Sequence, residues 1–166
     1  DEATRAGTYV AAAADGREAI VAAMRQGDRR IEHEALLAED EIEQIQKYGG
    51  YLVATPARFF HPAGIEKSAS KSPAIMQRLL AARETQDRVM PIALRSGLKV
   101  ALGSDNMHGL LSHDAGCLVR WGASPTAALH AATGMAAEAA MLADRGVLVA
   151  GRRADPRAWI CRGSRK

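Results

Sequence analysis

The sequence predicts an α/β fold built on a parallel sheet, and three observations favour it. Four short segments are expected to be strands along the 166 residues, three of them apolar runs and one, residues 28–33, polar with a central isoleucine. A segment with helical periodicity follows each of the four, and such alternation requires crossover connections between parallel strands. Hydrophobic residues make up 48% of the chain but aromatic residues only 4%, so alanine supplies much of the apolar content and favours helices.

The first half of the chain holds two of the predicted strand–helix units. Residues 8–14 (TYVAAAA) are expected to form a strand, and the helix after it to begin in a capping box with Asp15 as N-cap and Glu18 three positions later. Residues 28–33 (DRRIEH) form the second expected strand. A helix is expected over 39–48, where acidic residues crowd the first turns and suit the positive end of the helix dipole.

The third unit begins with an expected strand over 51–55. Residues 57–73 are then expected to be a long loop, which in a small domain is usually functional or mobile. A helix follows over 72–96, and Pro91 is expected to kink it or to divide it into two.

The fourth unit begins with an expected strand over 99–102, followed by a helix over 112–121. A further helix is expected over 124–134, with Ser at its N-cap and Pro in its first turn, and a last strand over 146–149. Four strand–helix units make either an open doubly wound sheet or half of a (β/α)8 barrel, and periodicity alone does not choose between them.

Composition and motifs exclude several function classes. No apolar run approaches the roughly 18 residues of a membrane span, and no GxGxxG or GxxxxGK[ST] motif follows a strand, which disfavours a nucleotide site. The net charge of +3 is uneven, because residues 152–166 carry six basic residues against one acidic residue. Aromatic residues do not alternate with these charges and no nucleic-acid motif accompanies them, so neither a nucleic acid nor a membrane is an expected partner.

Two further features bear on the cellular location of the protein and on whether the chain is processed. Cys117 and Cys161 are isolated rather than paired in a CxxC motif, which indicates reduced thiols and a cytoplasmic location. The sequence begins at Asp1 without a methionine or a signal-like segment, so we expect an excerpt or a processed chain.

Polar side chains stand at the ends of three successive predicted strands. His33 ends the second strand, Thr55 ends the third, and Asp105 follows the fourth after a glycine and a serine. Because the carboxyl ends of parallel strands share one rim, these side chains are expected to meet. Imidazole and carboxylate both suit zinc, so we favour a metal site. In the alternative, His33 donates to a neighbouring carbonyl and Asp105 caps a helix or turns the chain.

Five segments then carry a resemblance, in order and with matching spacing over about residues 5–155. They are Ile31–His33, Leu52–Pro56, Gly97–Asp105, Ser124–Thr133 and Gly146–Asp155. Together they resemble the second half of the metal-dependent amidohydrolase superfamily, most nearly its imidazolonepropionase and prolidase-like branch. Each segment alone is weak, but five in the right order are specific.

The resemblance implies the C-terminal half of a (β/α)8 TIM-like barrel with one or two divalent metals, usually zinc, at the strand carboxyl ends. In such enzymes a metal-bound hydroxide attacks an amide, lactam or ester carbon, and zinc brings the pKa of its bound water to about 7. His33 corresponds to the metal-ligating histidine of the sixth strand. Asp105 corresponds to the aspartate of the eighth strand, which binds metal and shuttles the proton as catalytic base. His108 and Thr55 are implied as substrate-binding residues.

The chain also departs from the family pattern. Ala13 stands where the fifth strand of the family ends in a ligand histidine, and a methyl group cannot bind a metal. The HxH pair of the first strand and the bridging residue of the fourth would lie upstream of Asp1. Of the usual ligands only His33 and Asp105 remain, whereas catalytic zinc normally takes three protein ligands. Residues 156–162 are basic where the family continues with an apolar strand.

Two functions therefore remain open. The chain is either a metal-dependent hydrolase of carbon–nitrogen bonds, present as a partial and inactive catalytic domain, or a non-catalytic half-barrel that serves as an interaction or structural module. Residues 1–145 are expected to form the partial barrel, and 146–166 a strand and a basic tail. A half-barrel leaves strand edges and an inner face uncovered, so self-association is expected, with a small-molecule substrate only if the site is completed.

Overall fold

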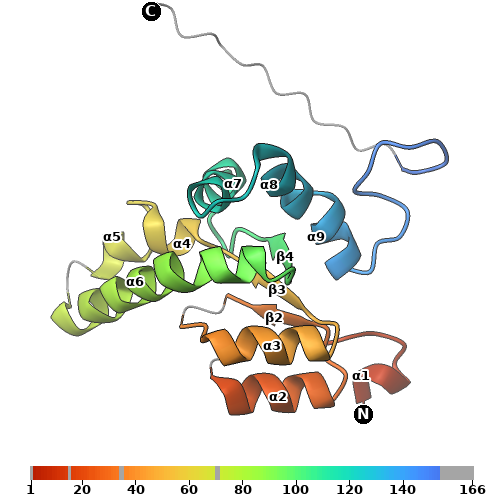
Figure 1. Ribbon diagram of the computed structural model, residues 1–166, viewed down its shortest axis with the longest axis horizontal. Helices are drawn as coiled ribbons and strands as arrows, with labels where there is room; N and C mark the ends of the chain where they lie inside the picture. Colours follow the sequence, from red (N-terminus) through yellow and green to blue (C-terminus); the bar gives the residue numbers. More distant parts are fainter. Residues whose placement is uncertain (1, 15, 34–35, 70–71, 154–166) are drawn as a thin grey trace, which may run out of the picture.

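Four strands form one parallel sheet in the order β1-β2-β3-β4 in the computed structural model (Figure 1). They are β1 (Ala11–Ala12), β2 (Arg30–Glu32), β3 (Tyr51–Ala54) and β4 (Lys99–Leu102). The structure describes residues 2–14, 16–33, 36–69 and 72–153. Each adjacent pair of strands is parallel, which confirms the predicted α/β fold with a parallel sheet.

Helices connect successive strands and continue after the last one. They are α1 (Glu2–Arg5), α2 (Arg17–Arg25), α3 (Glu39–Lys47), α4 (Ala57–Phe60), α5 (Ile65–Ala69), α6 (Pro73–Arg95), α7 (Leu111–Arg120), α8 (Pro125–Ala132) and α9 (Gly134–Ala139). In Figure 1, α2 and α3 lie side by side along the sheet, and α6 runs from the far end of α5 to the strands.

The two faces of the sheet have different covers, because successive residues of a strand point to opposite faces. Ile31, Leu52 and Val100 point into the main core, where buried residues of α2, α3, α6, α7 and α8 pack against them. Val53 and Ala101 point to the other face and pack against α9. Among the described helices, α9 therefore packs against this second face, over β3 and β4.

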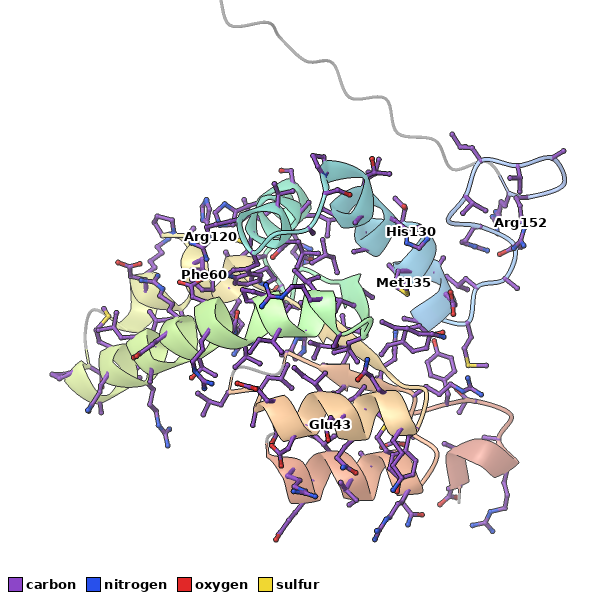
Figure 2. The ribbon with its side chains drawn as sticks, viewed as in Figure 1. Glu43, Phe60, Arg120, His130, Met135 and Arg152 are labelled. Carbon is purple, nitrogen blue, oxygen red and sulfur yellow. The ribbon has the colours of Figure 1, made fainter. Side chains whose placement is uncertain are left out.

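The segment 57–73 is not the predicted long loop, since α4 and α5 occupy most of it. Phe59 is buried with Leu79 of α6, and the Phe60 ring meets the Trp121 ring edge-on at a centroid distance of 5.5 Å. The Arg120 guanidinium lies 4.4 Å from the centre of the Phe60 ring, and Figure 2 shows the two side chains close together. Tertiary packing of these aromatic side chains supports helices too short for periodicity to reveal.

Helix α6 is not divided at Pro91, contrary to one of the two predicted outcomes. Proline removes one backbone donor, but Val89, Met90 and Ala93 around it are all buried in the main core. The packing of these side chains offsets the missing hydrogen bond.

The predicted helix over 124–134 is two helices, α8 and α9, which meet at Thr133. The predicted N-cap is confirmed, because the Ser124 hydroxyl accepts the N–H of Ala127 at 3.1 Å. Thr133 leaves helical geometry with φ −128° and ψ −86°, and Gly134 begins α9 rather than ending α8. This break allows α9 to reach the second face of the sheet.

Residues 146–149 do not form the predicted last strand. Leu148 is 83% exposed, and no described strand lies beside it to accept its backbone hydrogen bonds. Strand β1 is also shorter than predicted. Asp15, the expected N-cap, and residues 154–166, including Cys161, lie outside the described residues. Gly16 is the N-cap of α2. Cys117 is buried and makes no disulfide.

None of the described helices is long and apolar enough to span a lipid bilayer.

Candidate functional site

Three of the four predicted site residues meet at the carboxyl edge of the sheet. The Nε2 atom of His33 lies 3.7 Å from Oδ1 of Asp105, and the Thr55 hydroxyl lies 3.4 Å from Nδ1 of the same imidazole. The side chains of His33 and Asp105 are 34% and 17% exposed, so solvent reaches both. The parallel sheet therefore places a histidine and a carboxylate in contact, as the strand ends predicted.

The backbone of this rim adopts an uncommon conformation. His33, Asp105 and Asn106 have φ of 61°, 37° and 67°, and they are three of the four non-glycine residues with positive φ in the described part of the chain. The N–H of His33 donates to the carbonyl of Val53 at 3.1 Å, so this residue makes the last hydrogen bond between β2 and β3. Side chains of L-residues disfavour this region, and such strain concentrates at functional sites.

A tight turn holds Asp105 in place. The N–H of Met107 donates to the Ser104 carbonyl at 2.7 Å, which makes Asp105 and Asn106 the two central residues. Two central residues at positive φ are typical of a type I′ turn, which favours Asp, Asn and Gly. Asp105 is thus a turn residue whose carboxylate also lies against the His33 imidazole, so the two readings of Asp105 are compatible.

Arg58 completes the cluster, and the sequence does not predict it. Its guanidinium donates to Oδ2 of Asp105, while His33 lies against the other oxygen. Arg58 stands on α4 directly beyond β3, and its N–H donates to the Thr55 carbonyl at 3.2 Å. No sequence motif marks Arg58, which lies in the segment 57–73 that is expected to be a loop.

Asp114 on α7 anchors the helix that carries Arg58. Its side chain is fully buried, and Oδ1 accepts the N–H of Ala57 at 2.6 Å, whereas Oδ2 has no hydrogen-bond partner in the structure. Burial raises the pKa of Asp114 to about 6, although the Ala57 hydrogen bond opposes the shift. A carboxylate that satisfies the first N–H of α4 explains why this four-residue helix forms.

Comparisons with known proteins bear on this geometry. The adenine deaminase of Cereibacter sphaeroides is 32% identical over 126 residues, which are 76% of this chain and 20% of that protein. A solved prolidase in complex with N-methylphosphonate-L-proline is 28% identical, with a TM-score of 0.71 over 92% of this chain and 38% of its own. A solved amidohydrolase is 26% identical, with a TM-score of 0.76 over 91% of this chain and 37% of its own.

The chain belongs to the amidohydrolase superfamily. It spans about a fifth of the length of the curated relatives that it matches, and somewhat over a third of the solved amidohydrolase and prolidase chains. No protein-family model matches it.

The rim does not fit the zinc ion that membership of the amidohydrolase superfamily implies. Two zinc ligands at about 2.0–2.1 Å lie roughly 3.3 Å apart in a tetrahedral site, so the 3.7 Å between His33 and Asp105 is close to suitable. However, no three His, Cys, Asp or Glu side chains gather into a metal-binding group within the described residues. Ala13, directly after β1, has no ligand atom, and the Arg58 guanidinium holds one oxygen of Asp105.

His108 does not join the cluster of His33, Thr55 and Asp105. It is exposed, and no hydrogen bond or ion pair links it to His33, Thr55 or Asp105 in the described part of the chain. The implied role of His108 in substrate binding therefore stays a prediction.

A second polar cluster lies at the amino edge of the same sheet. The Tyr51 hydroxyl donates to Oε1 of Glu138 at 2.6 Å, and Nζ of Lys99 donates to the same oxygen at 3.0 Å and to the Tyr51 hydroxyl at 3.2 Å. The hydrogen bonds that Glu138 accepts from Tyr51 and Lys99 lower its pKa. The bond from Lys99 to Glu138 also raises the pKa of Lys99. Burial raises the pKa of Tyr51. The cluster ties α9 to the starts of β3 and β4.

Proposed function

We propose that residues 1–145 form the carboxyl-terminal half of an amidohydrolase barrel whose complete form hydrolyses carbon–nitrogen bonds in amides, lactams or peptide-like small molecules. The observation that carries this proposal is the contact between His33 and Asp105 across the carboxyl edge of a parallel sheet. In α/β barrels this edge carries the chemistry. In a completed barrel whose Asp105 is released from Arg58, His33 would bind the divalent metal, Asp105 would bind it and act as the base, and Thr55 would border the substrate.

The same residues support the proposal that the chain alone is catalytically inactive. His33 and Asp105 are two ligands, whereas catalytic zinc normally takes three from protein. Ala13 follows β1 where the family resemblance expects a third, and no metal-binding group of three gathers in the part of the chain that the structure describes. The remaining ligands would have to come from the rest of a complete barrel.

Hydrolysis assays test this proposal directly. The chain is incubated with a Xaa-Pro dipeptide and with adenine, each with and without zinc, and released proline or ammonia is measured. We expect no release above the buffer rate. Turnover that disappears in Asp105→Asn would contradict the inactive state.

A chimaera tests the hydrolase ancestry. The amino-terminal part of the matched prolidase, which this chain does not cover, is joined to the chain carrying Ala13→His and Arg58→Met. We expect dipeptide cleavage at least about tenfold above that of the same chimaera with Asp105→Asn, because a third ligand and a free carboxylate restore the set. Equal cleavage by both would contradict the role of Asp105.

The alternative is a non-catalytic half-barrel that acts by association, and the ion pair between Arg58 and Asp105 favours it. Strands β1 and β4 are the edges of the sheet, and Val10 before β1 is an exposed apolar residue. An unpaired edge offers backbone donors and acceptors to a second copy. We expect dimers in sedimentation velocity, and a monodisperse monomer would contradict association.

A further inference from the structure

Both carboxylate oxygens of Asp105 are engaged by nitrogen atoms of this chain. Oδ1 faces the His33 imidazole, and Oδ2 accepts from the Arg58 guanidinium. The Asp105 side chain is 17% exposed, so a cation in solvent can still reach it. Arg58 is a permanent positive charge, since a guanidinium does not lose its proton in a protein.

We propose that Arg58 is the built-in counterion of Asp105, and that its positive charge on Oδ2 disfavours a divalent metal between Oδ1 and the His33 imidazole. The inference deepens the proposed function, because it names the residue that keeps the rim free of metal. A divalent ion placed about 4 Å from a guanidinium meets a repulsion worth well over tenfold in affinity at the effective dielectric of a protein surface.

The position of Arg58 is fixed by the fold rather than by an adaptable loop. Its N–H donates to the Thr55 carbonyl, and the buried Asp114 carboxylate holds the adjacent Ala57 N–H. Gly64 lies against the Arg58 carbonyl so closely that an added Cβ would be 2.3 Å from that oxygen. These contacts set the backbone of Arg58, so its guanidinium reaches Asp105 from one direction.

Metal retention tests the inference with cobalt(II) as the probe. The wild-type chain, Arg58→Met, Arg58→Lys and the double variant Arg58→Met/Asp105→Asn are dialysed against cobalt(II), and bound metal is measured by elemental analysis and visible absorption. Lys99→Met is the matched control, because it removes one positive charge at the opposite edge of the sheet. The Arg58 side chain is 43% exposed, so its replacement leaves the core intact.

We expect Arg58→Met to bind cobalt at least about tenfold more tightly than the wild type, by removal of an adjacent like charge. The gain should vanish in the double variant, while Arg58→Lys and Lys99→Met should bind as the wild type does. The inference is overturned if the wild type retains one equivalent through Asp105, if Arg58→Met binds no better than Lys99→Met, if the gain survives Asp105→Asn, or if Arg58→Lys gains as much as Arg58→Met.

A second measurement does not depend on metal or on hydrolase ancestry. Thermal unfolding is followed for Arg58→Met, Asp105→Asn and their double variant. We expect each single change to lower the midpoint and the double change to lower it no further than the larger single effect, as for residues in contact. Strictly additive shifts would show that the two side chains do not interact and would overturn the counterion role, while leaving the proposed barrel ancestry untouched.

Discussion

The two edges of one sheet carry polar clusters with opposite construction. At the amino edge, Tyr51, Lys99 and Glu138 satisfy one another by hydrogen bonds, and none of them has positive φ. At the carboxyl edge, His33 and Asp105 meet through backbone held at positive φ. In α/β barrels the amino edge serves stability and the carboxyl edge chemistry, and the strain lies at the edge where that rule expects function.

The largest expected difference between the edges is in the pH dependence of stability at Asp114. Its pKa is about 6 in the folded chain against 3.8 as the ordinary value, so the folded state retains a proton that the unfolded state has released between these pH values. Stability should therefore fall as the pH rises from about 4 to about 6, by up to about 3 kcal/mol, and stay level above that. Urea unfolding at several pH values measures it, and Asp114→Asn should remove this component. An unchanged slope in the variant would contradict the assignment.

The amino edge should respond to pH in the opposite direction. The pKa of Glu138 is lowered by its hydrogen bonds to Tyr51 and Lys99, so its contribution is present above the ordinary pKa of glutamate and is lost as the pH falls through the lower folded value. The contributions of Asp114 and Glu138 to stability change with pH in opposite directions. Measuring the free energy of unfolding across the pH range therefore separates them.

A side chain at Gly64 should cause the next largest loss of stability, and this loss should come from the carboxyl edge alone. An added methyl group would meet the Arg58 carbonyl oxygen, which belongs to the backbone and cannot rotate away. We expect Gly64→Ala to cost about 2 kcal/mol in urea unfolding. The matched control is Gly116→Ala on α7, where nothing lies within 4 Å and a gain of about 0.5–1 kcal/mol is expected. A neutral Gly64→Ala would count against the tight corner.

Glu138→Gln should weaken the amino edge by about 1 kcal/mol, because it removes the charge from two hydrogen bonds while conserving shape. The loss should appear in urea unfolding at pH 7 and leave cobalt binding by the Arg58 variants unchanged. An effect on metal binding would mean that the two edges are coupled.

The smallest expected effect is that of Thr55→Val, about 0.5 kcal/mol in thermal unfolding. The Thr55 hydroxyl lies 3.4 Å from the His33 imidazole, at the long limit of a hydrogen bond, and valine preserves the branched shape. A loss well above 1 kcal/mol would assign Thr55 a larger structural role.

The sequence predicted the sheet and three members of the rim for a simple reason. Short apolar runs that end at turn residues locate β3 and β4. The geometry of parallel strands then brings His33, Thr55 and Asp105 to one edge of the sheet. Arg58 and Asp114 could not be found in this way. The role of Asp114 depends on how α7 packs against α4, and that of Arg58 on the placement of α4 beside Asp105. No local pattern encodes a contact between residues 57 apart.

The same reasoning explains the errors at the end of the chain. Residues 146–149 read as a strand by composition, but a strand needs a neighbour and none of the described strands lies beside them. Thr133 interrupts what reads as one helix, and the separate α9 then covers the second face of the sheet. The local sequence indicates the propensity of a segment for helix or strand, whereas strand pairing and side-chain packing decide which structure it adopts.

X-ray diffraction at the zinc absorption edge, from crystals of this chain grown with zinc, tests directly whether Arg58 keeps metal away from Asp105. We expect the Arg58 guanidinium on Asp105 and no anomalous peak between His33 and Asp105. A peak ligated by both His33 and Asp105 would show that the rim holds a metal in spite of Arg58.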